Sequence, residues 1–166
     1  MSSFRVFIGI DPGLKGAIVA ILGNGDLLEC HDTPLDGKRV SPSGIARIIG
    51  DIAHRYANIS HACVEVQHAM PKQGATSGFT IGETYGIIRG VLSALGIPYL
   101  EVRASAWQKI VLAGVPGAET KERSIRAAKS RCPKLAVETP RGRQLDGRAD
   151  AYHIACWARL QVMERM

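Results

Sequence analysis

Four acidic residues occupy positions from which their carboxylates can be brought together. Asp11 ends the apolar run VFIGID, and Glu65 lies near the end of a second apolar run. Asp146 and Asp150 are four residues apart, a spacing that puts both on one side of a helix. Anions this close would raise one another's pKa, so such a cluster is favoured only when a cation neutralises it. The sequence therefore predicts a cation site shared by these four acids.

The ligand type decides which cation is expected. Carboxylates are hard oxygen ligands, and the four cysteines show no spacing typical of zinc. We therefore expect Mg2+, with Mn2+ as a substitute, at two ions per site and with no small-molecule cofactor. Two such ions, about 4 Å apart, can activate a water and stabilise the leaving oxygen of a phosphodiester. The predicted chemistry is metal-dependent phosphodiester hydrolysis.

Each acid also has a plainer structural explanation. Asp11 begins Asp-Pro-Gly, a tripeptide typical of turns, and Glu65 could face water on an edge strand. Asp146 could equally be the N-cap of the last helix, and Asp150 a solvated acid of its first turn. Only the combination of the four favours a site, so the role of each acid stays open.

Apolar runs and turn residues predict the elements that carry these acids. Short apolar segments separated by turn residues predict an antiparallel three-strand meander, and a later strand that follows a helix needs a parallel neighbour. The strands are expected at residues 4–10, 17–22, 27–30, 62–66 and 98–102. The helices are expected at residues 41–56, 76–95, 107–112, 121–131 and 149–162. This pattern predicts one α/β domain over residues 1–166, with a mixed five-stranded sheet flanked by helices.

The charge of the chain is concentrated in one segment. The 166 residues carry a formal net charge of +6, and residues 121–148 hold nine Lys and Arg against three acids. A localised basic excess suits a polyanion such as nucleic acid, although a run of charges is more often a solvated face. No apolar run approaches the roughly 20 residues of a membrane span, and no signal-peptide pattern is present. We therefore expect a cytoplasmic protein that binds no membrane.

Glycines recur every four residues in the second predicted helix, at Gly78, Gly82, Gly86 and Gly90. Each costs about 1 kcal/mol relative to alanine in a helix interior. Close approach of another backbone would offset this cost. Packing of the stripe on the protein's own sheet is favoured over packing on a second subunit.

Three longer stretches follow one another between residues 4 and 160: IGIDPGLKGAIV, VEVQHAMPKQGATSGFTIGETYGIIRGVL and DGRADAYHIACWA. Together they resemble the RuvC-type Holliday-junction resolvases of the RNase H-like superfamily. The resemblance implies an RNase H-like fold and a magnesium-dependent, homodimeric endonuclease. Such an enzyme resolves four-way and other branched double-stranded DNA by paired nicking, in DNA recombination and repair.

The resemblance also implies roles for the acids. The family's first-strand aspartate matches Asp11, its later strand glutamate matches Glu65, and its last-helix aspartate matches Asp150. The fourth family acid falls on Gly147, and this chain has Asp146 one position earlier. The resemblance thus predicts Asp11, Glu65 and Asp150 as catalytic metal ligands and leaves Asp146 as the candidate fourth.

DNA contacts are implied in the same way. Lys121 corresponds to a phosphate-contacting catalytic lysine, and Lys109 corresponds less closely to a second one. His68 stands where family members often carry an aromatic wedge that opens the junction. This departure is compatible with a phage or otherwise divergent relative. The basic residues expected to contact DNA are Lys109, Lys121, Arg123, Arg126, Arg141, Arg143 and Arg148.

Two other functions stay open. A non-catalytic junction-binding or architectural protein would keep the fold and the basic surface, and the shifted Asp146 is compatible with that. A phosphotransferase of the actin or sugar-kinase type would also begin with a Gly-Asp turn over nucleotide phosphates. Such enzymes have a duplicated and much longer chain, which argues against this alternative.

Overall fold

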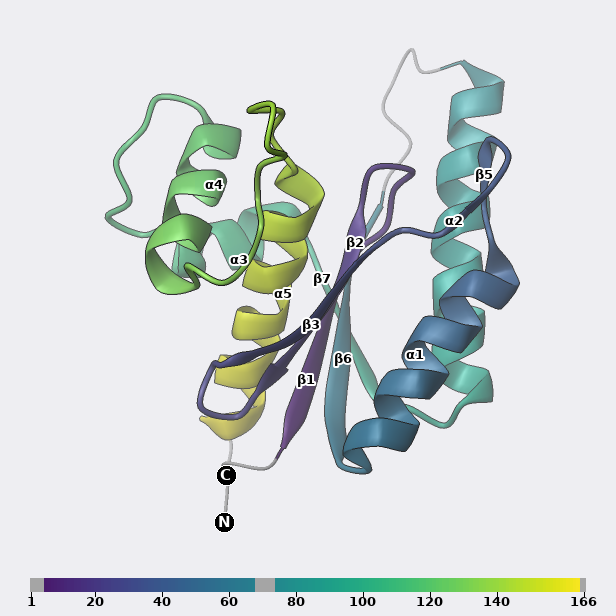
Figure 1. Cartoon of the computed structure of the whole chain (residues 1–166). Coiled ribbons are helices and arrows are strands. Elements are labelled where there is room, and N and C mark those ends of the chain that lie inside the picture. The colour runs from purple at the N-terminus through teal and green to yellow at the C-terminus, as the bar shows by residue number, and fades with distance from the viewer. Residues whose placement is uncertain (1–4, 68–73, 165–166) are drawn as a thin grey trace.

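A five-stranded sheet with the strand order β3-β2-β1-β6-β7 forms the middle layer of the molecule (Figure 1). The computed structural model describes residues 5–67 and 74–164. β1, β2 and β3 form an antiparallel meander, and β6 and β7 continue the sheet in parallel to β1. The predicted mixed sheet is confirmed. Its strands are β1 (Val6–Asp11), β2 (Ala17–Leu22), β3 (Leu27–Asp32), β6 (Ile59–Glu65) and β7 (Tyr99–Val102).

Helices cover both faces of the sheet (Figure 1). On one face lie α1 (Pro42–Tyr56) and α2 (Ala75–Ala94). The other face carries α3 (Ala104–Val111), α4 (Thr120–Arg131) and α5 (Asp146–Met163). Within the described ranges, no helix combines the length and the apolar character that crossing a membrane requires.

A small second sheet follows the meander and was not among the predicted elements. It consists of the two-residue strands β4 (Leu35–Asp36) and β5 (Arg39–Val40). Strands this short lack the alternation by which a longer strand is recognised. The sheet leads into α1, where Ser41 is the N-cap and its Oγ accepts from the Gly44 amide at 3.1 Å.

The alternation of β1 and β6 decides which side of the sheet their last residues face. Both strands are apolar on both sides because helices cover both faces. Ile8 packs in the core beneath α1 and α2, whereas Phe7 and Cys63 belong to the core beneath α5. Side chains alternate along a strand, so Asp11 and Glu65 also face the α5 side.

Small residues allow α5 to lie directly against the sheet. A Cβ at Gly9 of β1 would overlap the Ala151 carbonyl oxygen and the Ala155 backbone in α5. A Cβ at Gly147 would overlap the carbonyl oxygen of Lys15 in the turn after β1. Glycine is required at both positions because no side chain fits between the two backbones. The first turn of α5 is thereby held next to the end of β1.

The start of α5 corrects one interpretation of the sequence. The helix begins at Asp146, three residues earlier than expected, and its N-cap is Leu145 without a side-chain capping bond. Asp146 is therefore the first helical residue, and its interpretation as the N-cap is wrong. Asp146 and Asp150 lie one turn apart within the same helix.

The glycines of α2 do not pack on the sheet, so the preferred explanation of their spacing is wrong. A Cβ at Gly82, Gly86 or Gly90 would meet no atom within 4 Å, and all three residues are exposed. The helix faces the core with Ile88 and Leu92 instead. The stripe therefore points away from the sheet.

β3 is the outermost strand on one side of the sheet. Its Glu29 forms an ion pair with Arg55 of α1 and a hydrogen bond with His31 on the same strand, the latter at 2.8 Å between Oε2 and Nε2. Charged side chains are a common feature of such edges.

We predict that Gly9→Ala lowers the free energy of unfolding by about 3 kcal/mol, because the added methyl group must push α5 off β1. Urea denaturation measures this change. Gly50→Ala in α1 is the matched control, because a Cβ there meets no atom within 4 Å. The control should be neutral or stabilising by up to about 1 kcal/mol. Equal effects of the two substitutions would contradict the close approach.

Candidate active site

The ends of two neighbouring strands bring the first two acids together. β1 and β6 are parallel, with Ile10 opposite Val64, so Asp11 and Glu65 emerge at the same edge of the sheet. Both face α5, as the alternation requires. Neighbouring strands lie about 4.8 Å apart, which places the two side chains next to each other.

Asp11 has the most perturbed environment of the four acids. Burial raises its pKa well above the ordinary value, and the carboxylates of Asp150, Glu65 and Asp146 raise it further, in that order. Asp11 thus feels the charge of each of the other three acids. Gly147 closes over it, since a Cβ there would lie 3.1 Å from Asp11 Oδ2.

Asp150 adds a carboxylate from the first turns of α5. Burial raises its pKa to about 6, and the charges of Glu65 and Asp146 act in the same direction. A hydrogen bond from Ser124 Oγ in α4 to Asp150 Oδ1 opposes this rise, as does the charge of Lys121. Asp150 is therefore held from α4 while it faces the other acids.

Glu65 is held from the other side of the site. The indole Nε1 of Trp107 in α3 donates to Glu65 Oε2 at 2.6 Å, and Gln67 Nε2 donates to Oε1 at 3.3 Å. Burial raises the pKa of Glu65, and these two hydrogen bonds lower it. Trp107 is fully buried, so its indole fixes the carboxylate firmly.

Asp146 lines the pocket beside the site and forms an ion pair with a lysine. Its Oδ2 is 2.8 Å from Lys121 Nζ at the start of α4, and the Asp146 side chain is 39% exposed. An ion pair this open is worth less than about 1 kcal/mol. Asp146 can therefore exchange Lys121 for another cation at little cost.

The donor set fits a hard divalent cation, since four carboxylates converge and their mutual repulsion is relieved by positive charge. The present side-chain arrangement is more open than a finished metal site. In the described part of the chain, no three His, Cys, Asp or Glu side chains form a group that could hold a metal ion. Three of the acids instead direct an oxygen to Trp107, Ser124 or Lys121.

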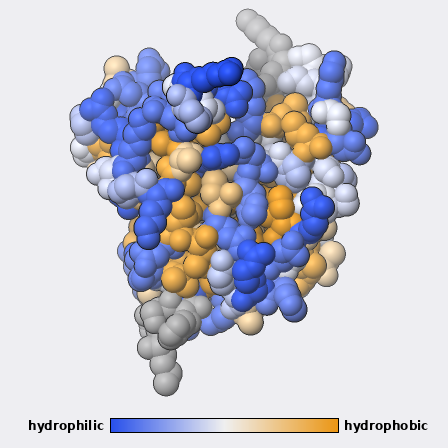
Figure 2. Space-filling view, in the orientation of Figure 1, coloured by the Kyte–Doolittle hydropathy of each residue, from blue (hydrophilic) through white to orange (hydrophobic). Residues whose placement is uncertain are grey.

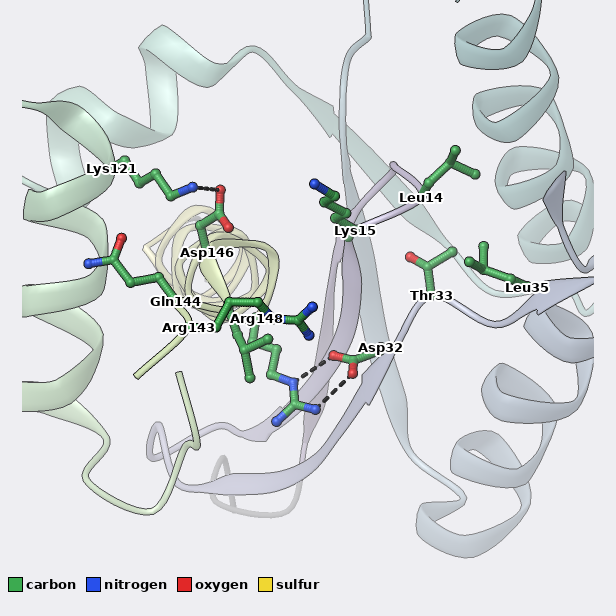
Figure 3. A pocket seen from close by; sticks show the side chains of 12 residues that line it. Leu14, Lys15, Asp32, Thr33, Leu35, Lys121, Arg143, Gln144, Asp146 and Arg148 are labelled. Carbon is green, nitrogen blue, oxygen red and sulfur yellow. Dashed lines mark hydrogen bonds and ion pairs between the residues drawn. The ribbon is translucent and has the colours of Figure 1, made fainter. Parts of the chain in front are cut away.

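A pocket of about 710 Å³ opens beside Asp146 (Figure 3). Lys121 and Asp146 line it from the α4 and α5 side, and Lys15 lines it from the turn after β1. Hydrophilic residues gather on the surface over α4 and the segment that leads into α5 (Figure 2). The residues lining the pocket are Leu14, Lys15, Gly16, Asp32, Thr33, Leu35, Lys121, Arg143, Gln144, Leu145, Asp146 and Arg148.

Some of the expected DNA-contacting residues have structural partners. Arg148 makes a two-pronged ion pair with Asp32 of β3, at 2.6 and 2.8 Å (Figure 3). Arg123 donates to the carbonyl oxygens of Val115 and Leu112 and so fixes the segment between α3 and α4.

The remaining basic residues are more accessible. Arg126 pairs with Glu122 one turn away on the exposed face of α4. Arg143 extends into the pocket, whereas Lys109 and Arg141 are exposed outside it. His68 lies outside the described residues, so its expected role as a wedge stays a prediction.

Three contributions to the site were missed by sequence reasoning. They are the contributions of Trp107, Ser124 and Lys15. The partner of Trp107 is 42 residues away and that of Ser124 is 26 residues away, so no local pattern reveals either contact. Lys15 could have been found, because a lysine four residues after Asp11 lies in the same turn.

Solved structures with a similar fold were found, although no family model and no curated protein matches the sequence. Thermus thermophilus RuvC in complex with a Holliday junction substrate aligns with a TM-score of 0.66 at 19% identity, over 96% of both chains. A second structure of Thermus thermophilus RuvC aligns with a TM-score of 0.61 at 25% identity, also over 96% of both chains. The yeast mitochondrial Holliday junction resolvase Ydc2 gives 0.55 at 15% identity, over 99% of this chain and 81% of the other.

The chain has a RuvC-like fold. The structural matches cover nearly the whole chain, which confirms the resemblance noted in the sequence at the level of the fold. The expected phage origin stays a prediction. The RuvC-like fold provides the frame on which the four acids of this chain meet.

His153 of α5 lies behind the site and makes the stability of the folded protein depend on pH. The residue is fully buried, its Nε2 donates to the Ser124 carbonyl oxygen at 2.9 Å, and its ring stacks on Trp107. Burial lowers the pKa of the imidazole from 6.5 to about 4. Below pH 6.5 the unfolded chain therefore binds a proton that the folded protein does not.

We predict that the unaltered protein loses about 3 kcal/mol of unfolding free energy relative to His153→Phe as the pH falls from about 7 to about 4. The raised pKa values of the carboxylates act the other way, but they are common to both proteins and cancel in the comparison. Urea denaturation at several pH values measures the difference. His54→Phe, at an exposed position of α1, should show no such trend. A pH-independent difference for His153→Phe would contradict the assignment.

Proposed function

We propose that this chain is a divalent-cation-dependent endonuclease that cuts four-way and other branched DNA junctions as a homodimer, with residues 1–166 forming one nuclease domain. The observation that carries the proposal is the position of Asp11, which feels the charges of Asp150, Glu65 and Asp146. A fold gains nothing in stability from collecting four anions, so the cluster favours a role in binding cations. The fold of junction resolvases supports this choice.

Asp11, Glu65 and Asp150 would hold Mg2+ or Mn2+, and Asp146 would join them after leaving Lys121. When bound, two such ions supply charge neutralisation and an activated water for phosphodiester hydrolysis. Lys121, 2.8 Å from Asp146, is then free to stabilise negative charge on the phosphate. Lys121 and Asp146 line the pocket, and Asp11 feels the charges of Asp150, Glu65 and Asp146.

The DNA backbone would run along the pocket and the face of α4. Lys15, Lys121 and Arg143 line the pocket, and Arg126 is exposed on α4. Contacts of this kind bind phosphates without reading sequence and weaken steeply as salt is added. Arg148 and Arg123 would contribute mainly by shaping this surface, because Asp32 and backbone carbonyl groups already occupy them.

The outward face of α2 supports a homodimer. Gly82, Gly86 and Gly90 leave open space beside the helix, and Phe79 next to them is 61% exposed. Glycines that cost helix stability are explained if a second backbone approaches them closely. A twofold-symmetric pair would also supply the two cuts that resolving a four-way junction requires.

A non-catalytic junction-binding protein is the second candidate. It is favoured by the side-chain arrangement, since no three potential ligands among the described residues form a group that could hold a metal ion. Binding of junction DNA without cleavage in either Mg2+ or Mn2+ would establish this second function.

We predict that Asp11→Asn reduces cleavage of a synthetic four-way junction at least about 100-fold while junction binding persists, because a charged oxygen ligand is lost. Labelled four-way, three-way and linear DNA, each with and without Mg2+, measure cleavage and substrate preference. The thermal unfolding temperature should not fall, since the substitution removes a buried charge that three acids oppose. Asp51→Asn, at an exposed position of α1, is the control. Undiminished cleavage by Asp11→Asn would refute the site.

We predict that Gly86→Leu weakens self-association about 10- to 100-fold, because a leucine side chain cannot fit where two backbones meet. Sedimentation equilibrium measures the change. Gly50→Leu, at a helix glycine whose Cβ direction is also open, should leave self-association unchanged. Unfolding is not expected to interfere, because leucine favours a helix more than glycine does. A dimer that tolerates leucine at residue 86 would place the interface elsewhere.

A further inference from the structure

Three buried side chains connect the two carboxylates that lie on opposite sides of the site. Trp107 of α3, Ser124 of α4 and His153 of α5 are each at most 1% exposed. Trp107 contacts Glu65, and Ser124 contacts Asp150. His153 lies between them.

The two outer members of this group act as donors to the carboxylates. An indole N–H can only donate, so Trp107 Nε1, 2.6 Å from Glu65 Oε2, requires that oxygen as an acceptor. Ser124 Oγ donates to Asp150 Oδ1. Both bonds leave each carboxylate restricted in rotation, because the donors themselves are packed in the core.

His153 ties the two donors to each other. Its ring stacks on the Trp107 indole, with 5.9 Å between centroids and 24° between planes. Its Nε2 donates to the carbonyl oxygen of Ser124 at 2.9 Å. One imidazole ring therefore contacts both the Trp107 indole and the backbone of Ser124.

We propose that Trp107 and Ser124, coupled through His153, are positioning residues that set the Glu65 and Asp150 carboxylates as one unit for cation binding. This inference rests on the proposed function and concerns how its site is held. Residues that hydrogen-bond to metal ligands typically change metal affinity about 10- to 100-fold when they are substituted. Packing alone would not require donors at both outer ends of the group.

The test measures Mn2+ binding to the full chain without DNA, using electron paramagnetic resonance to follow free Mn2+. Trp107→Phe keeps a ring but removes the donor, and Ser124→Ala removes only the hydroxyl. We expect each to bind Mn2+ about 10- to 100-fold more weakly. The Mg2+ concentration for half-maximal junction cleavage should rise to match, while junction affinity in the absence of metal stays unchanged.

Matched controls are available for both substitutions. Trp157→Phe repeats the aromatic change at the other tryptophan, whose indole nitrogen has no hydrogen-bond partner among the described residues. Ser130→Ala repeats the serine change at an exposed position of the same helix, α4. Both controls should bind Mn2+ like the unaltered protein. Ser124→Ala also protects the test against misfolding, because it removes a single oxygen atom.

Coupling through His153 is tested by combining the substitutions. If the two donors act as one unit, Trp107→Phe with Ser124→Ala should weaken Mn2+ binding by less than the product of the single effects. A multiplicative loss would overturn the coupling.

Mn2+ binding and junction cleavage together distinguish a wrong positioning role from a wrong proposed function. Unchanged Mn2+ affinity in Trp107→Phe and Ser124→Ala, in a protein that binds Mn2+ and cleaves junctions, would overturn the positioning role alone. An unaltered protein that neither binds Mn2+ nor cleaves DNA would overturn the proposed function, and the positioning role with it.

Discussion

The candidate site depends on direct contact between the backbone of α5 and the backbone of β1. Gly9 and Gly147 leave no room for a side chain between these elements, and Ala151 and Ala155 continue the small surface along the helix. Because the contact is made by main-chain atoms, the position of α5 cannot be adjusted by changing a rotamer. The distance from the end of β1 to Asp150 is consequently a property of the fold. The backbone positions of Asp11 and Asp150 are therefore preorganised before any ligand arrives, whereas their side chains can still adjust.

The acids lie where they reduce the stability of the protein. Burial and the neighbouring carboxylates raise the pKa of Asp11, and burial raises that of Asp150, so each opposes folding while it is charged. Two extensive apolar cores, one on each face of the sheet, provide the stability that offsets this. Active sites commonly show this conflict between function and stability. Here the conflict is confined to one edge of the sheet, and the interiors of β1 and β2 are purely apolar.

Features that repeat along the chain could be predicted, and contacts between distant segments could not. The five main strands follow from apolar runs and turn residues, and parallel pairing then places Asp11 beside Glu65. The sequence wrongly predicted that the glycine stripe with Gly86 packs on the sheet. A spacing of four residues shows that the glycines share one face of a helix, but it does not show what that face contacts. The N-cap of the last helix is Leu145 and not Asp146, a difference of one residue that the sequence pattern does not resolve.

The hydrogen bonds that hold Glu65 and Asp150 could not be predicted from the sequence either. Trp107 and Ser124 come from helices that meet only after the chain has folded, and their partners are 42 and 26 residues away. Nothing in the residues around either one distinguishes it from an ordinary core position. The catalytic roles of the acids themselves stay predictions, whereas their convergence follows from the topology.

The polar contacts of Glu29 on the edge strand β3 affect how copies of this protein can associate. A strand from another molecule that added to β3 would approach the exposed side chains of His31 and Arg55, and would remove part of these polar groups from water. At the opposite end of the sheet, β7 has only four residues and offers a short template. Continuous intermolecular sheets, the usual beginning of fibrous aggregates, are thus discouraged at both margins, and contacts between copies are left to the helical surfaces.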